Sequence, residues 1–226
     1  MNVRRHPTAG FSRTDVLVAL AAIALLSALA LIPMTRTRQA AHLAQCIANL
    51  QQVNRAVASY AGDHTQTLPG TMPGDGGELQ WWYKERVKGY AGLKGPSSAN
   101  DSVFACPDDR GYSDPKPFHQ TARFDYGSYN FNGVQIPGAP NVAGATLGSL
   151  VEPKRTLLTM EWAAHGPLSW HRSRTGHRNA PFYCDAESVV GFADGRVALI
   201  PIYYDGHTAA YLRDPIPGYE YRYSGN

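Results

Sequence analysis

The chain has 226 residues, enough for one compact domain with a hydrophobic core in addition to a separate N-terminal segment. Its formal net charge is +3 and its basic residues form no stripe, so the composition does not indicate nucleic-acid binding. Most of the 22 glycines and 16 prolines follow residue 62, which predicts a loop-rich C-terminal part.

The N-terminal 34 residues divide into a short basic leader and a long apolar run. The leader ends in Gly10, Phe11 follows it, and Asp15 lies five positions past the glycine. The run extends from Val16 to Met34 and is interrupted only by one serine and one proline. Alanine and leucine make it helix-prone, and a helix of this length spans or nearly spans a bilayer core of roughly 30 Å. We therefore expect residues 11–34 to form a transmembrane helix.

Three interpretations of this arrangement are open. A secretory signal peptide would have an apolar region of about 7–15 residues with a small-residue cleavage site behind it, and neither feature fits well. A plain signal anchor would remain uncleaved. A type IV prepilin-like N-terminus is cut before the apolar segment, and we favour it because a basic leader, Gly10 and Phe11 occur in that order. Arginines on this side would keep the N-terminus cytoplasmic by the positive-inside rule.

The N-terminus resembles that of type IV prepilins, and the resemblance implies roles for three residues. A prepilin peptidase would cut between Gly10 and Phe11, and the new amino group of Phe11 would be methylated. Glycine suits a protease that requires an extended, unhindered backbone before the bond. Asp15 stands where the family has a glutamate that pairs with the free amine of a neighbouring subunit. The family usually reads GFTLxE, whereas this chain reads GFSRTD, with Arg13 in place of an apolar residue.

Residues 35–62 show the spacing of an amphipathic helix. Apolar side chains recur every three or four positions, at Leu43, Ile47, Leu50, Val53, Val57 and Tyr60. This is the period of one helical face, and Gly62 is a suitable C-terminal cap. We expect the helix to pack its apolar face on the domain that follows.

Segments further along the chain resemble, in order, one group of pseudopilin-like proteins, the planctomycete and verrucomicrobial type with a C-terminal H-x9-DG motif. The matching segments are Cys46–Val53, Tyr60–Asp63, Phe104–Asp109, Tyr126–Asn130, Glu152–Glu161 and Val190–Val197. The resemblance implies a pilin-like α+β fold. In that fold a long N-terminal helix, membrane-spanning in its first half and amphipathic in its second, packs on a small antiparallel β-sheet with long loops.

The same resemblance implies a division of the chain. The expected parts are a prepilin leader at 1–10, a transmembrane or filament-core helix at 11–34, an amphipathic spine helix at 35–62 and a soluble pilin-like domain at 63–226. Strand-like runs in the last part are short, at residues 155–162, 188–192 and 196–204. Asp194 and Gly195 lie between two of these apolar runs and predict a hairpin turn.

Three cysteines, Cys46, Cys106 and Cys184, allow one disulfide in three pairings with one cysteine left over. The family resemblance favours the pair Cys46–Cys106, because both lie in segments that carry it. Such a bridge would tie the spine helix to the first long loop. The sequence has no CxxC or Cys/His spacing typical of zinc, so we expect no zinc site.

Acidic residues offer a candidate calcium site, the one cofactor that we consider. Carboxylates of Asp108, Glu161 and Asp194, with Asp109 beside them, could supply oxygens to a hard cation, which needs six to eight. The alternative is that the aspartates accept backbone N–H bonds in turns. His177, Asp194 and Gly195 correspond to the ends of the family's H-x9-DG motif, although 16 residues separate His177 from Asp194 here.

The resemblance implies a pseudopilin or minor pilin-like structural subunit of a type II secretion or type IV pilus-like filament, with no catalytic residues. The expected partners are other pilin or pseudopilin subunits, a prepilin peptidase, an inner-membrane assembly platform and the lipid bilayer, and not nucleic acid. The expected location is the bacterial inner membrane, crossed once, with a cytoplasmic N-terminus and a periplasmic soluble domain.

Two alternatives come from other classes of protein. The first is a membrane-anchored periplasmic module that binds carbohydrate or a partner through aromatic residues such as Trp81 and Trp82, although core packing explains most aromatics equally well. The second is a tethered enzyme. Its candidate groups are His165, His171, His177, Cys184, Glu161 and Asp194. No known spacing joins these groups into a nucleophile, a base and an orienting group.

Overall fold

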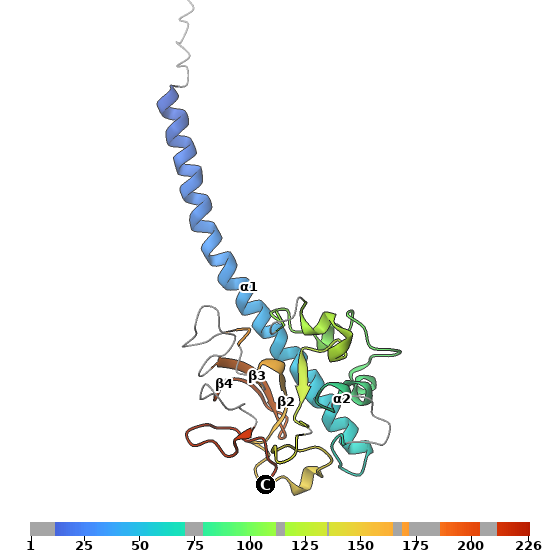
Figure 1. Ribbon diagram of the computed structural model, residues 1–226. Coiled ribbons are helices and arrows are strands. Elements are labelled where there is room, and N and C mark those ends of the chain that lie inside the picture. Colours follow the sequence, from blue (N-terminus) through green and yellow to red (C-terminus); the bar gives the residue numbers. More distant parts are fainter. Residues whose placement is uncertain are drawn as a thin grey trace, which may run out of the picture. The chain divides into compact units, whose positions relative to one another are not determined.

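The longest element is helix α1, Arg13–Asp63, in a computed structural model of the chain (Figure 1). The structure describes residues 12–70, 79–111, 116–134, 136–164, 169–171, 186–203 and 212–226, without the side chains of residues 26–35, 79, 80 and 163. The chain forms two compact units, one up to Ala41 and the other from His42 to Asn226. The predicted boundaries at residues 10, 34 and 62 are not tested by this division.

In the first unit, a capping box starts α1. The backbone N–H of Ser12 donates to Oδ2 of Asp15 at 2.9 Å, which satisfies a donor that the first turn of a helix leaves unpaired. The carboxylate also lies where the helix dipole favours negative charge. Asp15 therefore has a partner within its own chain.

The prediction that the first half of this helix spans a membrane is wrong. Within the described part of the chain, no helix has both the length and the apolar character needed to cross a bilayer. This finding also overturns the single-pass inner-membrane location and corrects the expected fold, whose helix 11–34 was to be transmembrane.

In the second unit, α1 buries one face. Cys46, Leu50, Val53, Val57 and Ala61 are 0% exposed and follow the spacing of three and four residues that the sequence shows. Aromatic and aliphatic side chains from the loops and the sheet complete this core. The expected packing of the apolar face is confirmed.

Among the described residues, the sheet has four antiparallel strands in the order β1-β2-β3-β4. The strands are β1 (Tyr129–Phe131), β2 (Leu157–Glu161), β3 (Ala186–Phe192) and β4 (Val197–Ile202). Between β3 and β4 the chain turns at Asp194 and Gly195, as predicted. Gly195 has φ 92°, a conformation that favours glycine, and Asp194 Oδ1 accepts the N–H of Arg196 at 3.0 Å.

One buried amide on α1 binds two strands of this sheet. Nδ2 of Asn54 donates to the carbonyl of Phe192 in β3 at 2.9 Å, and its Oδ1 accepts the hydroxyl of Thr159 in β2 at 2.9 Å. Gly191 makes this close approach possible, because a Cβ there would lie 2.7 Å from Thr159 Oγ1 and 2.8 Å from Asn54 Oδ1. A polar residue in the helix thus fixes its position on the sheet.

Helix α2 (Leu79–Val87) and short 3₁₀ turns form the rest of the described regular structure. The turns are η1 (Lys88–Ala91), η2 (Ser102–Phe104), η3 (Phe118–Gln120), η4 (Ala122–Phe124), η5 (Leu147–Ser149) and η6 (Trp162–Ala164). Lys84 of α2 is only 1% exposed and lies 2.9 Å from Oδ2 of Asp101. Its ammonium also donates to the carbonyls of Asp125 and Tyr126, at 2.7 and 3.1 Å. The buried cation is therefore paired and hydrogen-bonded, as burial of a charge requires.

A buried histidine and carboxylate cluster beside the disulfide

The structure joins Cys46 of α1 to Cys106 of the loop after η2, the pairing that the resemblance favoured. Both cysteines are 0% exposed. The backbone around the bond is held by side chains. The N–H of Cys106 donates to Ser128 Oγ at 3.0 Å, and the hydroxyl of Tyr129 donates to the carbonyl of Cys46 at 3.2 Å. The disulfide thus lies in the buried core, and the backbone of both cysteines is hydrogen-bonded to neighbouring side chains.

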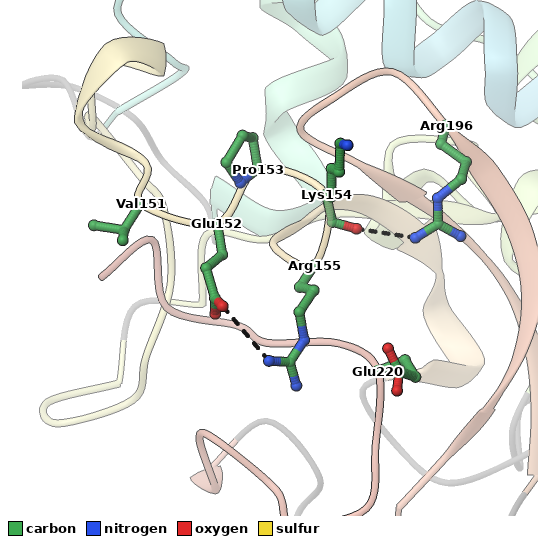
Figure 2. A pocket seen from close by; sticks show the side chains of 7 residues that line it. All are labelled: Val151, Glu152, Pro153, Lys154, Arg155, Arg196 and Glu220. Atoms are coloured by element: carbon green, nitrogen blue, oxygen red, sulfur yellow. Dashed lines mark hydrogen bonds and ion pairs between the residues drawn. The ribbon is translucent and has the colours of Figure 1, made fainter.

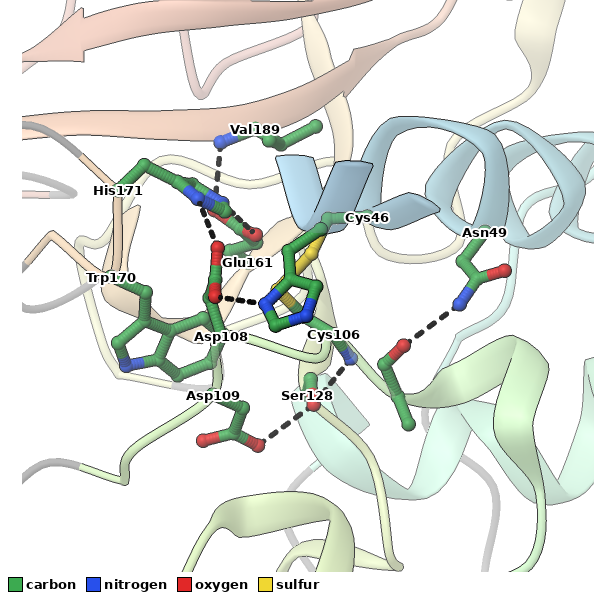
Figure 3. The surroundings of a disulfide bond; sticks show 12 residues. Cys46, Asn49, Cys106, Asp108, Asp109, Ser128, Glu161, Trp170, His171 and Val189 are labelled. Atoms are coloured by element: carbon green, nitrogen blue, oxygen red, sulfur yellow. Dashed lines mark hydrogen bonds and ion pairs between the residues drawn. A yellow bond between two sulfur atoms is a disulfide. The ribbon is translucent and has the colours of Figure 1, made fainter. Parts of the chain in front are cut away.

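A series of four ionisable side chains, linked by hydrogen bonds, begins beside this bond. Figure 3 labels Glu161, His171 and Asp108 of this series. Nε2 of His171 lies 2.8 Å from Oε1 of Glu161, and its Nδ1 lies 3.2 Å from Oδ2 of Asp108. The other oxygen of Asp108 lies 2.8 Å from Nδ1 of His42. The side chain of His42 is 43% exposed, whereas those of His171 and Glu161 are 3% and 0% exposed. This series of side chains therefore leads from the surface, at His42, into the core, at Glu161.

Glu161 ends strand β2, and the sheet holds its carboxylate in place. Oε2 accepts the N–H of Val189 in the neighbouring strand at 2.8 Å, which leaves Oε1 for His171. Burial alone would lower the pKa of His171. The hydrogen bond and the charge of Glu161, with the charge of Asp108, outweigh burial and raise this pKa above its ordinary value. The cluster thus favours a protonated imidazole between two carboxylates.

A second network surrounds Asp109, which is 4% exposed. Its Oδ2 accepts the hydroxyl of Ser128 at 2.7 Å and the N–H of His119 at 3.1 Å, and its Oδ1 accepts the N–H of Gly111 at 2.8 Å. The carboxylate stands between serine and histidine, and the serine hydroxyl donates to the carboxylate. Activation of a serine nucleophile needs the histidine in the central place. We therefore assign this network a structural role in the loop.

The predicted calcium ligands separate into two places. Asp108 and Glu161 meet on either side of His171, while Asp194 lies in the turn between β3 and β4 and accepts a backbone N–H there. The turn role was the alternative stated for the aspartates. Calcium binding itself stays a prediction.

Several predicted residues lie outside the described part of the chain. These are Gly10, Phe11, His165, His177 and Cys184. His42 was missed, although a signal for it exists, because it lies four residues before Cys46 on α1 and such residues share a helical face.

Most of the described aromatic side chains belong to the core. Trp81 is 8% exposed and packs against Phe124 and Trp162 with ring centroids 4.8 and 5.7 Å apart. Tyr221 and Tyr223 are also buried. Trp82 is 39% exposed. The packing interpretation of the aromatics is confirmed for these core residues, and a sugar-stacking surface gains no support from them.

A separate cavity of about 560 Å³ lies beside the turn before β2 (Figure 2). Its lining residues are Val151, Glu152, Pro153, Lys154, Arg155, Arg196 and Glu220. Arg196 donates to the carbonyl of Lys154 at 2.9 Å and lies over the ring of Phe192 at 3.7 Å. Arg155 donates to the carbonyl of Tyr219 at 3.0 Å. Both guanidinium groups are therefore already engaged by the protein.

Comparison with known proteins adds no assignment. No family model matches the chain. No curated protein and no solved structure matches it significantly. Function therefore has to be argued from the residues and their geometry.

Proposed function

We propose that the protein is a pseudopilin-like or minor pilin-like structural subunit of a type II secretion or type IV pilus-like filament. The observation that carries the proposal is the exposed apolar surface of α1 in the first unit. Six large apolar side chains there are 49–69% exposed: Val16, Leu17, Val18, Leu20, Ile23 and Leu25. An apolar surface of this kind requires a partner.

The arrangement of these side chains favours several partners over one. At 100° per residue, positions 16, 17 and 18 already point in three different directions around the helix. A helix that is apolar on all sides is stable only when it is surrounded. The core of a filament, in which each helix is packed by the same segment of neighbouring subunits, supplies such surroundings. Arg13 and Asp15 at one end offer opposite charges that can pair between neighbours.

Processing at the leader is the first test. Co-expression with a prepilin peptidase should shorten the chain by residues 1–10 and leave an N-terminus at a methylated Phe11, which intact mass spectrometry resolves. Gly10→Val should block the cut, because it places a branched side chain before the scissile bond. A chain that keeps Met1 in the presence of an active peptidase would contradict the proposal.

Assembly of the processed chain is the second test. The double variant Leu17→Lys/Val18→Lys places charge on the apolar surface and should abolish filaments seen by electron microscopy. Gln39→Lys adds a charge at another exposed position of α1 and should leave them intact. Filaments that form equally in both variants would rule out this surface as the assembly interface.

A further inference from the structure

Four side chains at the disulfide bring metal-binding atoms together. Cys46, Cys106, Glu161 and His171 each offer one ligand atom, and these atoms all lie within 4.8 Å of one another. In the disulfide the two sulfurs cannot act as thiolates, and thiolate is the form that binds metal. The donor set is therefore incomplete as long as the bond exists.

The two remaining ligands are held as ligands of a metal usually are. Glu161 is anchored through Oε2 on the N–H of Val189, so Oε1 faces the imidazole. His171 is anchored through Nδ1 on Asp108, so Nε2 faces Oε1 at 2.8 Å. Figure 3 shows this pair next to the sulfurs. A carboxylate behind a histidine is the usual support of a zinc-bound imidazole, because it fixes the ring and raises its basicity.

We propose that reduction of the Cys46–Cys106 disulfide converts this cluster into a zinc site with ligands from Cys46, Cys106, His171 and Glu161. A dithiol reductant gives two electrons and two protons to the disulfide and becomes a disulfide itself. Zinc then binds the two sulfurs, Nε2 of His171 and Oε1 of Glu161; it displaces the two thiol protons and the Nε2 proton of the imidazolium to solvent, and so takes the place of the hydrogen bond between His171 and Glu161. A disulfide oxidant reverses the step: it takes two electrons from the two thiolates and two protons from solvent to become a dithiol, the Cys46–Cys106 bond re-forms, and the metal is released.

The donor set selects zinc over calcium. Two sulfurs, one nitrogen and one oxygen suit tetrahedral zinc, whereas calcium takes six to eight oxygens. Two sulfurs at about 2.3 Å from a tetrahedral ion lie about 3.8 Å apart, so the reduced pair has to separate only slightly to bind. The four ligand side chains are almost entirely buried, which leaves no described opening for a substrate. The site is therefore structural, and it links α1 to the same loop that the disulfide links.

Cobalt(II), a coloured substitute for zinc, provides the test. The full chain, reduced with a phosphine under argon and freed of metal, should bind one cobalt ion and develop the near-ultraviolet thiolate band and intense visible bands of tetrahedral cobalt. Zinc should bleach both. The oxidised chain should show neither band at the same concentrations.

Variants separate this site from other thiols. Cys184→Ser should bind cobalt as the natural chain does, whereas Cys46→Ser/Cys106→Ser should lose the thiolate band. Glu161→Gln and His171→Gln should weaken binding at least tenfold, and Asp108→Asn should weaken it about tenfold through the histidine. His119→Gln, a histidine outside the cluster, is the matched control. Circular dichroism of each reduced chain checks folding, and Glu161→Gln keeps an acceptor for Val189.

The proposal fails if the reduced chain shows no thiolate band. It also fails if the band disappears in Cys184→Ser or is unchanged in both Glu161→Gln and His171→Gln. These outcomes are independent of cleavage at Gly10 and of filament formation.

Discussion

A buried aspartate should make the stability of the second unit depend on pH. Asp125 is 3% exposed, and its Oδ2 has no hydrogen-bond partner among the described residues. Burial raises the pKa of Asp125 from 3.8 to about 6; the charge of Lys84 opposes the shift and that of Glu85 adds to it. The folded protein therefore holds a proton that the unfolded chain has lost. This stabilisation is complete below about pH 4 and disappears as the pH rises through about 6.

The expected magnitude follows from the two values. The interval from 3.8 to about 6 corresponds to about 3 kcal/mol at 1.36 kcal/mol per pH unit, and residual solvent screening reduces this to about 2 kcal/mol. Asp125→Asn removes the titration and keeps a residue that tolerates the φ of 48° at this position. As the pH rises from 4 to 7.5, the difference in unfolding free energy between the variant and the natural chain should therefore shift by about 2 kcal/mol in favour of the variant.

Urea denaturation of the oxidised chain at pH 4, 6 and 7.5 measures this difference. The comparison includes the natural chain, Asp125→Asn and a control variant, Glu220→Gln. Glu220 is an exposed carboxylate, so the difference in unfolding free energy between the control and the natural chain should not change with pH. A difference between the natural chain and Asp125→Asn that stays constant across this range would refute the reasoning.

Three further changes test other contacts. Gly191→Ala should lower the unfolding free energy by about 1–3 kcal/mol, because its Cβ would collide with buried side chains. Gly89→Ala is the control, because a Cβ at that position would have no atom within 4 Å. Equal losses of unfolding free energy for the two variants in urea denaturation would contradict this prediction. Because the pKa of His171 is raised, its stabilisation is present below about pH 6.5 and lost as pH rises through the folded value. As the pH rises from 6 to 9, the unfolding free energy of the natural chain should therefore fall relative to that of His171→Gln. Urea denaturation measures both values, and a difference between them that does not change with pH would contradict this prediction. Cys46→Ser/Cys106→Ser opens a loop with a sequence separation of 60 residues and should cost about 4 kcal/mol; an unchanged Tm would show that the bridge contributes nothing.

Local patterns in the sequence predicted the local structure. The spacing of Leu50, Val53 and Val57 correctly indicated the buried face of α1, and Asp194-Gly195 correctly indicated the turn between β3 and β4. Both signals depend on residues a few positions apart, where backbone geometry alone decides the result.

Contacts between distant parts of the chain were not predictable in this way. His171 meets Asp108 across 63 positions, and His42 meets the same carboxylate across 66. Lys84 is buried and donates to the carbonyls of Asp125 and Tyr126, which lie 41 and 42 positions away. The apolar run after Asp15 was read as a membrane span from its composition, and the described residues do not bear that out.

The amide of Asn54 has a mechanical consequence. Its two hydrogen bonds reach separate strands, so a displacement of α1 along its axis by even one residue breaks both at once. A pull along the helix is then resisted in shear by bonds loaded together, and the sheet is carried with the helix as one body. Asn54→Leu should keep the apolar packing of this face but lower the force at which the helix is drawn out of the domain.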